Sequence, residues 1–252
     1  MAWLYALSRT ALALAFVAFA FTSDIYGQQV IVLNTSNAPP NSTSDDRGIG
    51  DQVLTEAFRR IGITLKIDHL PSERALLNAD DGVEDGNFAR VEGMEKTYRN
   101  LVRVPEEISR FEFVAFSRRY SFKIAGWDSL RPYNIGIVTG WKILETNIAG
   151  TSSLASIRDA QLLFRMLLDD KVDVVVYDRM QGLVLLRDLK ISSIHVLWPP
   201  LAVKGMYLYM NRRHLELVPR IAGAIRGMKK DGTYRKITDE VLKRYGVKLT
   251  RD

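Results

Sequence analysis

The chain has 252 residues, 47% of them hydrophobic, and a formal net charge of +6 at pH 7. This composition provides enough apolar side chains for one large domain or two smaller lobes, and it excludes an intrinsically disordered chain. The sequence contains no cysteine, so we expect neither a disulfide nor a lipid attached to an N-terminal cysteine.

The positive charge is spread along the chain and does not gather in one segment. Lysine and arginine number 35 against 29 acidic residues, and basic runs are no longer than pairs such as Arg59-Arg60. Domains that bind nucleic acids carry a clustered basic patch or stripe, so no nucleic-acid partner is expected. The excess of positive charge favours an acidic ligand or electrostatic steering of one.

The N-terminal segment has the layout of a secretory signal peptide. Arg9 precedes an apolar run over residues 11–21, which is shorter than the roughly 20 apolar residues that a membrane-spanning helix needs. We therefore predict a signal peptide over residues 1–27, cleaved after Gly27, and a periplasmic mature protein. Cleavage near residues 18–20 and an uncleaved anchor are the alternatives.

Short β-branched runs alternate with amphipathic helical segments along most of the chain, which predicts parallel sheets in an α/β fold. The expected strands cover residues 29–34, 63–68, 111–116, 121–125, 134–138, 172–177, 194–198 and 206–210. The expected helices cover residues 51–61, 73–79, 162–167, 180–189, 215–228 and 234–245, and another begins after residue 141. Pro199 and Pro200 are expected to stop the strand before them. The long polar loop over 35–44 is a place where a ligand could bind.

Motifs for catalysis, metals and cofactors are missing from the sequence. The three histidines, His69, His195 and His214, are far apart and lack H-E-x-x-H spacing, so no zinc site is expected. There is no G-x-S-x-G motif, and the glycines over residues 48–50 lack the third glycine of a dinucleotide fingerprint. We expect no catalytic residues, no metal and no cofactor.

Four segments carry a resemblance to a known family when they are taken in chain order. They are residues 48–62, the short Val83-Glu-Asp-Gly86 stretch, residues 171–178, and residues 228–237 followed by Arg244-Tyr-Gly246. In this order they resemble the family 3 extracellular solute-binding proteins, the polar amino-acid receptors of bacterial ABC importers. The likeness covers nearly all of the chain after the signal peptide, and the C-terminal segment is the most specific part.

The resemblance implies a two-lobed, type II periplasmic-binding fold in which two crossing strands join the lobes. Lobe one is then discontinuous, with residues 28–118 and 205–252, and lobe two comprises residues 119–204. The crossings are expected near residues 118–122 and 201–206. The ligand is expected in the cleft between the lobes, where loops and helix N-termini supply backbone N–H groups.

Family members that bind amino acids use an arginine of lobe one for the carboxylate and an aspartate of lobe two for the ammonium group. Asp178 matches that aspartate in position, although it could simply cap the helix that begins near Met180. The family's Ser-x-x-x-x-Arg signature is absent, which weakens the case for an amino-acid ligand. Arg90 and Arg99 remain as candidates, and Arg90 is preferred because it lies closer to the end of the strand. The alternative is a solvated loop arginine.

Other candidates lie where strands turn into helices. Thr139, Gly140 and Trp141 follow an expected strand, a geometry in which backbone N–H groups can bind an anion. Trp141 could stack on the ligand or pack between the lobes. Glu73 begins a helix behind Pro71 and is expected to face the cleft, although acidic residues are common in the first turn of any helix.

Two classes of function remain open. The first is a monomeric periplasmic solute-binding protein that captures a small polar, carboxylate-bearing ligand and serves a membrane permease or a sensor receptor. The second is a periplasmic dehydratase-like enzyme on the same fold that acts on prephenate-like acids. That enzyme would need a general acid in the cleft, and Glu73 or Glu92 would have to serve.

Overall fold

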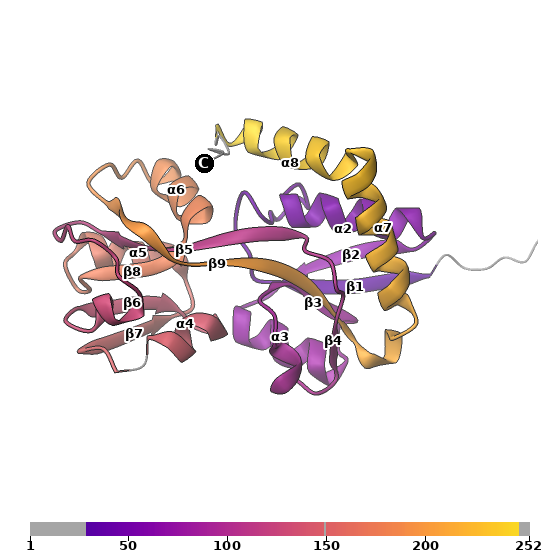
Figure 1. The fold of residues 1–252 in the computed structure, drawn as a ribbon, viewed down its shortest axis with the longest axis horizontal. Helices are drawn as coiled ribbons and strands as arrows, with labels where there is room; N and C mark the ends of the chain where they lie inside the picture. Colours follow the sequence, from indigo (N-terminus) through magenta and orange to yellow (C-terminus); the bar gives the residue numbers. More distant parts are fainter. Residues whose placement is uncertain (1–28, 149, 247–252) are drawn as a thin grey trace, which may run out of the picture.

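The structure is a computed structural model that describes residues 29–148 and 150–246. The predicted signal peptide lies outside the described residues. Figure 1 shows an elongated molecule in which two groups of strands and helices lie side by side and two long strands run between them. Within the described ranges, no helix combines the length and hydrophobicity that crossing a membrane requires.

The strands follow the hydrogen-bonded order β2-β1-β3-β9-β5-β8-β6-β7, and β4 pairs with β9 beside this path. Within each group the pairs β1–β2, β1–β3, β6–β7 and β6–β8 are parallel, while β9 and β5 run antiparallel to their neighbours. The strands are β1 (Val30–Thr35), β2 (Thr64–His69), β3 (Gly86–Arg90), β4 (Leu101–Arg103), β5 (Ser109–Ser117), β6 (Asn134–Val138), β7 (Ser153–Ile157), β8 (Val174–Asp178) and β9 (His195–Asn211).

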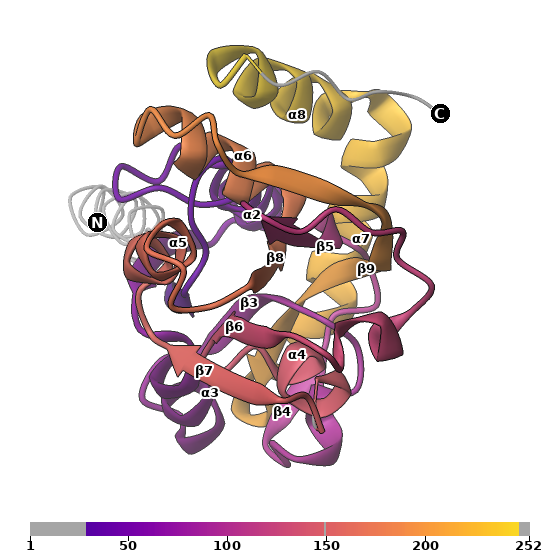
Figure 2. The same ribbon diagram turned by 90° about the vertical axis from the view of Figure 1, so that its left-hand side faces the viewer.

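Helices cover both sides of the first strand group, which contains β1, β2 and β3. Helices α2 and α7 lie on one side of it and α3 on the other (Figures 1 and 2). In α2 the residues Val53, Leu54 and Phe58 are fully buried, as the apolar spacing of that segment predicts. The helices are α2 (Ile49–Arg60), α3 (Ser72–Asp81), α4 (Lys142–Asn147), α5 (Ala160–Leu168), α6 (Arg179–Asp188), α7 (Leu217–Asp231) and α8 (Thr233–Arg244).

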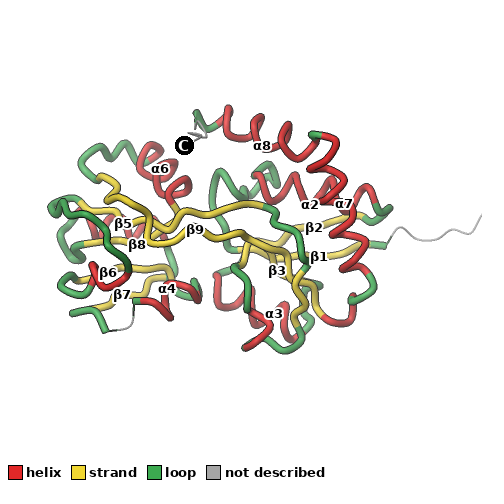
Figure 3. Tube along the Cα trace, in the orientation of Figure 1, coloured by secondary structure: helices red, strands yellow, loops and turns green. Residues whose placement is uncertain are grey.

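Strand β9 passes through both groups, as the tube in Figure 3 shows. Residues 207–211 pair with β3 and β4, whereas residues 195–206 pair with β5. Strand β5 pairs with β8 only from Phe113 onward, so the two crossing segments are residues 109–113 and 202–206. The first crossing segment therefore lies before the predicted position at 118–122, because β5 continues from the crossing into the second group as one strand. The lobe boundaries themselves remain a proposal, and we propose to end the first part of lobe one before Phe113.

Two predictions about strands are wrong. Residues 121–125 form no strand: Phe122 stacks on Tyr133 with ring centroids 4.6 Å apart, and Ile124 N–H donates to the Trp198 carbonyl oxygen at 3.1 Å. The two strands expected at 194–198 and 206–210 form the single strand β9. Strands β4 and β7 are absent from the sequence-based prediction.

The prolines of β9 do not stop the strand because they lie in a bulge. The pairing with β5 shifts register between Phe113 and Ala115, which face Ala202 and Leu197, so Pro199 and Pro200 have no partner in the ladder. A residue without a ladder bond needs no backbone N–H, which is the group that proline lacks. The strand therefore continues through both prolines.

Candidate ligand-binding site

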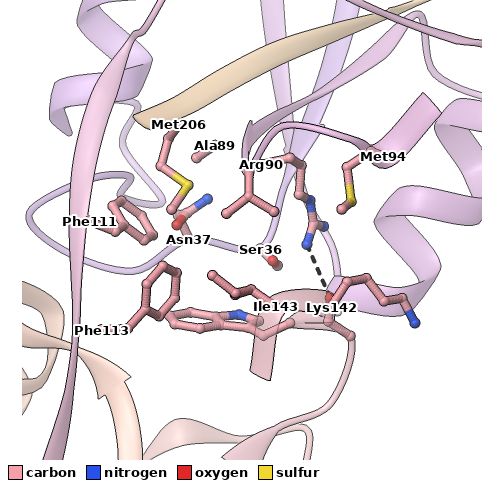
Figure 4. Close-up of a pocket in the computed structure, with 13 residues that line it drawn as sticks. Ser36, Asn37, Ala89, Arg90, Met94, Phe111, Phe113, Lys142, Ile143 and Met206 are labelled. Atoms are coloured by element: carbon pink, nitrogen blue, oxygen red, sulfur yellow. Dashed lines mark hydrogen bonds between the residues drawn. The ribbon is translucent and has the colours of Figure 1, made fainter. Parts of the chain in front are cut away.

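A small cavity of about 30 Å³ lies between the two strand groups, and it has room for about two water molecules. Its walls come from the loop after β1, the end of β3, the crossing segments of β5 and β9, and the turn into α4. Figure 4 shows Arg90 and Met94 across from Lys142 and Ile143, with Phe111, Phe113 and Met206 at one side. The lining residues are Ser36, Asn37, Ala89, Arg90, Val91, Met94, Phe111, Phe113, Gly140, Trp141, Lys142, Ile143 and Met206.

A wider cavity of about 540 Å³ adjoins the small one and shares Val91, Met94, Lys142 and Ile143 with it. Trp127 and Leu201 contribute apolar walls to this outer cavity. Ligand pockets for small molecules measure about 300–1,000 Å³, so the two cavities together provide a volume of the right order.

Arg90 enters the cavity through an irregularity at the end of β3. The pairing of β3 with β9 shifts register between Phe88 and Arg90, and Ala89 between them has a φ of 58°. A bulge of this kind redirects the side chain that follows it. A non-glycine residue in the left-handed region is strained, and such strain clusters at functional positions. The bulge therefore aims Arg90 into the cavity.

The guanidinium of Arg90 is buried and contacts only neutral acceptors. It donates to Ser72 Oγ at 2.7 Å, to the Ser72 carbonyl oxygen at 2.9 Å, to the Gly140 carbonyl oxygen at 3.4 Å, and to Asn87 Oδ1. Burial lowers the pKa of Arg90 to about 10, so the side chain is still cationic at neutral pH. The Glu73 carboxylate favours the charged form of Arg90 without a hydrogen bond to it. Burying a cation that has no directly bonded anion is costly for the fold, and an anion bonded to Arg90 in this cavity would offset that cost.

Buried amides hold Arg90 in place from behind. Asn87 accepts from Arg90 and donates to Asn34 Oδ1 at 2.6 Å, and Asn34 donates to Glu84 Oε2 at 2.6 Å. Asn34 lies on β1 and Asn87 on β3, next to each other in register. The two strands therefore fix both the position and the direction of the guanidinium.

Gly140 touches the N-terminus of α3 on the opposite side of the cleft. A Cβ at Gly140 would lie 2.6 Å from Glu73 N and 3.0 Å from Ser72 Oγ, and the residue has a φ of +86°. Both the space and the backbone conformation require glycine here. In this structure the two lobes are thus in direct contact beside the cavity.

One ion pair, between Lys142 and Glu73, crosses the cleft and supports this contact. Lys142 Nζ lies 2.6 Å from Glu73 Oε2 and 2.9 Å from Glu145 Oε2. Burial opposes the charge on Lys142, but the hydrogen bonds to Glu73 and Glu145 outweigh it and raise the pKa of Lys142. Glu145 also accepts from the Gly140 N–H at 2.6 Å, and Tyr98 OH donates to Glu73 at 3.4 Å. Lys142 is therefore paired with two carboxylates, and one of them, Glu73, also favours the charge of Arg90.

Aromatic rings form one wall of the cavity. Trp141 is stacked on Tyr177 with ring centroids 4.7 Å apart, and Phe113 approaches it edge-on at 5.9 Å. Phe111 lies 6.2 Å from Trp141. Tyr177 lies on β8, in the same strand group as Trp141, so this stacking packs Trp141 within that group and not between the lobes, while its remaining surface lines the cavity.

Asp178 is a helix cap and does not line the cavity. One carboxylate oxygen accepts from the Gln181 N–H at 3.1 Å and the other from the Glu112 N–H at 3.2 Å. Burial raises the pKa of Asp178 to about 7. The capping alternative considered for this residue is thus the arrangement in the structure.

The loop after β1 reaches the second group of strands through Gln181. The Ala38 N–H donates to Gln181 Oε1 at 3.1 Å, and Gln181 Nε2 lies 3.5 Å from Asn37 Oδ1. Ser36 and Asn37 of the same loop line the cavity. This loop is the polar segment over 35–44 in which ligand contacts were expected.

The structure brings together three of the six candidate residues: Arg90, Gly140 and Trp141 all line the small cavity. Glu73 lies beside it, paired with Lys142. The Thr139 hydroxyl forms a hydrogen bond with Ser156 Oγ at 2.8 Å, and Thr139 does not line the cavity. Asp178 does not line the cavity either. The alternative arginine, Arg99, is exposed, and Glu92 lines only the outer cavity.

No protein-family model matches the chain. A curated relative from Shewanella oneidensis, described as an uncharacterized protein, is 26% identical over 196 residues, which cover 73% of this chain and 72% of that protein.

Solved structures with a similar fold are binding and sensor domains. A histidine kinase sensor domain similar to periplasmic binding proteins superposes with a TM-score of 0.75 at 17% identity, covering 85% of this chain and 96% of that one. The chain has the periplasmic-binding-protein fold. The GluR0 ligand-binding core from Nostoc punctiforme in complex with glutamate gives a TM-score of 0.70 at 17% identity, with 83% and 98% coverage. An amino-acid ABC transporter substrate-binding protein from Streptococcus pneumoniae, bound to arginine, gives 0.70 at 14% identity, with 88% and 97% coverage.

Proposed function

We propose that this chain is a periplasmic solute-binding protein. It captures a small, carboxylate-bearing ligand between its two lobes and presents that ligand to the permease of an ABC importer or to a membrane sensor. The observation that carries the proposal is Arg90, a buried cation that faces the inter-lobe cavity and contacts only neutral acceptors. The chain acts as a monomer and performs no covalent chemistry.

The chemistry of Arg90 favours a carboxylate. A guanidinium is planar and can bond both oxygens of one carboxylate at once. Of the four bonds that Arg90 makes, the one to the Gly140 carbonyl oxygen crosses the cleft and is the longest, at 3.4 Å. Separation of the lobes breaks that bond first and frees an N–H for the ligand.

Lobe closure is supported by contacts that join the two sides of the cleft. Gly140 against Ser72, Lys142 with Glu73, and the Ala38 N–H with Gln181 all lie around the cavity. A ligand that binds between the lobes adds contacts to both sides and therefore favours the closed arrangement.

The dehydratase alternative finds less support in the geometry. Glu73 does not line the small cavity and is bound to Lys142, while Glu92 lies at the outer cavity and pairs with Arg103 at 3.2 Å. Neither carboxyl faces the space beside Arg90. Structures of similar fold are described as transport and sensor proteins, which supports a binding role of either kind.

The test begins with a thermal-shift screen of small metabolites, because a bound ligand raises apparent stability by mass action. Calorimetry then compares wild type with Arg90→Met for each hit. Loss of a charge-assisted contact worth roughly 1.5–3 kcal/mol weakens binding by about one to two decades. Arg99→Met is the matched control, because Arg99 is exposed; it should bind as wild type does. Equal affinity in Arg90→Met would show that another group holds the ligand.

Export is tested independently of binding. Mass spectrometry of the periplasmic fraction should find a mature N-terminus between Phe21 and Gln28, because the apolar run and polar region match a cleaved signal peptide. Intact Met1 on soluble protein from the cytoplasm would contradict a periplasmic location.

A further inference from the structure

The charged side chains on the wall of the small cavity are all cations. Its charged lining residues are Arg90 and Lys142, and Lys142 is already paired with Glu73 and Glu145. No aspartate or glutamate is among the described residues that line it. Resting on the proposed function, we infer that the ligand is an apolar carboxylic acid that carries no ammonium group.

Asp178 does not supply the missing anion. Both of its oxygens accept backbone N–H groups, from Gln181 and from Glu112, and its side chain is absent from the cavity wall. Its partner in strand register, Phe113, lines the cavity instead. The residue of this strand pair that lines the cavity is therefore an aromatic ring and not a carboxylate.

The rest of the wall suits an apolar body. The residues that face the space beside Arg90 are largely aromatic, aliphatic or thioether side chains, which gain from contact with apolar groups. They include Met94, Phe111, Phe113, Trp141, Ile143 and Met206. The outer cavity adds Trp127 and Leu201 to this surface, and its polar residues include Glu92 and Lys204. The part of the ligand next to a carboxylate at Arg90 therefore lies in apolar surroundings.

An ammonium group in this site would lose its water without gaining an anionic partner. A buried charge without a partner is strongly disfavoured. The Gly140 carbonyl oxygen is a neutral acceptor on the wall, and the positive field of Arg90 repels a second cation. We therefore expect an amino acid to bind at least tenfold more weakly than the acid of the same side chain.

Two matched series of probes separate the head group from the body. The first is 3-phenylpropanoate, L-phenylalanine and phenethylamine, and the second is hexanoate, L-norleucine and pentylamine. Calorimetry on the wild-type protein should rank the acid first and the amino acid at least tenfold weaker, with no measurable binding of the amine. An amino acid that binds as tightly as its acid would overturn the inference.

Asp178→Asn provides an independent readout on the same probes, and its folding is checked by thermal denaturation. Asparagine is also a good N-cap; its one oxygen can accept from the Gln181 N–H, whereas its amide NH2 cannot accept from the Glu112 N–H. The acid should bind this variant as tightly as wild type, because Asp178 does not line the cavity. A tenfold loss confined to the amino acid would show that Asp178 holds an ammonium group, against the inference.

The outcomes also separate this inference from the proposed function. If a zwitterionic or polar metabolite binds and apolar acids do not, the inference is wrong while the proposed function stands. If no small molecule in the screen binds, both are wrong.

Discussion

Gly140→Ala should prevent the lobes from closing without unfolding either lobe. The added Cβ would lie 2.6 Å from Glu73 N and 3.0 Å from Ser72 Cβ and Oγ. Non-bonded carbon atoms prefer separations of about 3.5–4.0 Å, so this part of the cleft must open by about 1 Å. Overpacking of this kind costs about 1–3 kcal/mol, and the cost falls only on the closed form.

A second effect acts on the open and closed forms alike. Gly140 has a φ of +86°, and an alanine in the left-handed region costs about 1–2 kcal/mol. Gly232→Ala isolates this effect, because Gly232 has a φ of +85° and no heavy atom within 4 Å of the added Cβ. Both variants should lose about 2–8 °C in Tm, at about 2–4 °C per kcal/mol for a chain of this size.

Ligand affinity then distinguishes the two variants. A penalty of about 1–3 kcal/mol on the closed form corresponds to about 5- to 150-fold, and Gly140→Ala should lose that factor in affinity by calorimetry while Gly232→Ala loses none. Small-angle scattering at a ligand concentration that saturates wild type but not Gly140→Ala should show full compaction for wild type and Gly232→Ala and less for Gly140→Ala. If Gly140→Ala binds and compacts like its control, the lobes do not meet at Gly140 when the ligand is bound.

Other predictions concern Asp178 and Ala89. Because burial raises the pKa of Asp178 from 3.8 to about 7, the folded chain holds a proton there that the unfolded chain releases; this stabilisation is full below pH 3.8 and is lost as the pH rises through 7. Asp178→Asn should therefore show a smaller fall in Tm than wild type between pH 5 and pH 8, and an equal fall would refute the assignment. Ala89→Gly relieves a φ of 58°, worth about 1–2 kcal/mol, against about 0.5–1 kcal/mol for the greater freedom of glycine in the unfolded chain. The Tm of Ala89→Gly should equal or exceed that of wild type, whereas Ala115→Gly in the interior of β5 should have a lower Tm.

The periodicity of the sequence predicts most of the fold because local patterns decide most of its elements. The buried run at Val174–Asp178 and the apolar face of α2 are visible in the sequence alone. The continuous β9 is not, since two prolines in sequence normally stop a strand, and here the pairing with β5 leaves them outside the ladder. That pairing joins residues about 90 positions apart, which no local pattern records.

The candidate site could be predicted only in part, for a related reason. Arg90 was found from its place after a strand, but the bulge at Ala89 that turns it into the cavity depends on pairing with β9. Phe111 and Phe113 lie two positions apart in a predicted strand and therefore share one face of it. The sequence does not show whether that face lines the cavity. The sequence suggests Gly140 as a source of a backbone N–H for an anion, but that N–H donates to Glu145, and the contact of Gly140 with Ser72 becomes visible only when the two lobes are placed together.

The most direct test of the account is a crystal structure of the protein with the tightest ligand from the screen. The account predicts that the ligand lies between the lobes, with a carboxylate bonded to the guanidinium of Arg90 and its body against Phe111, Phe113 and Trp141. A ligand bound outside this cleft, or one inside it that leaves Arg90 bonded only to Ser72, Asn87 and Gly140, would contradict the account.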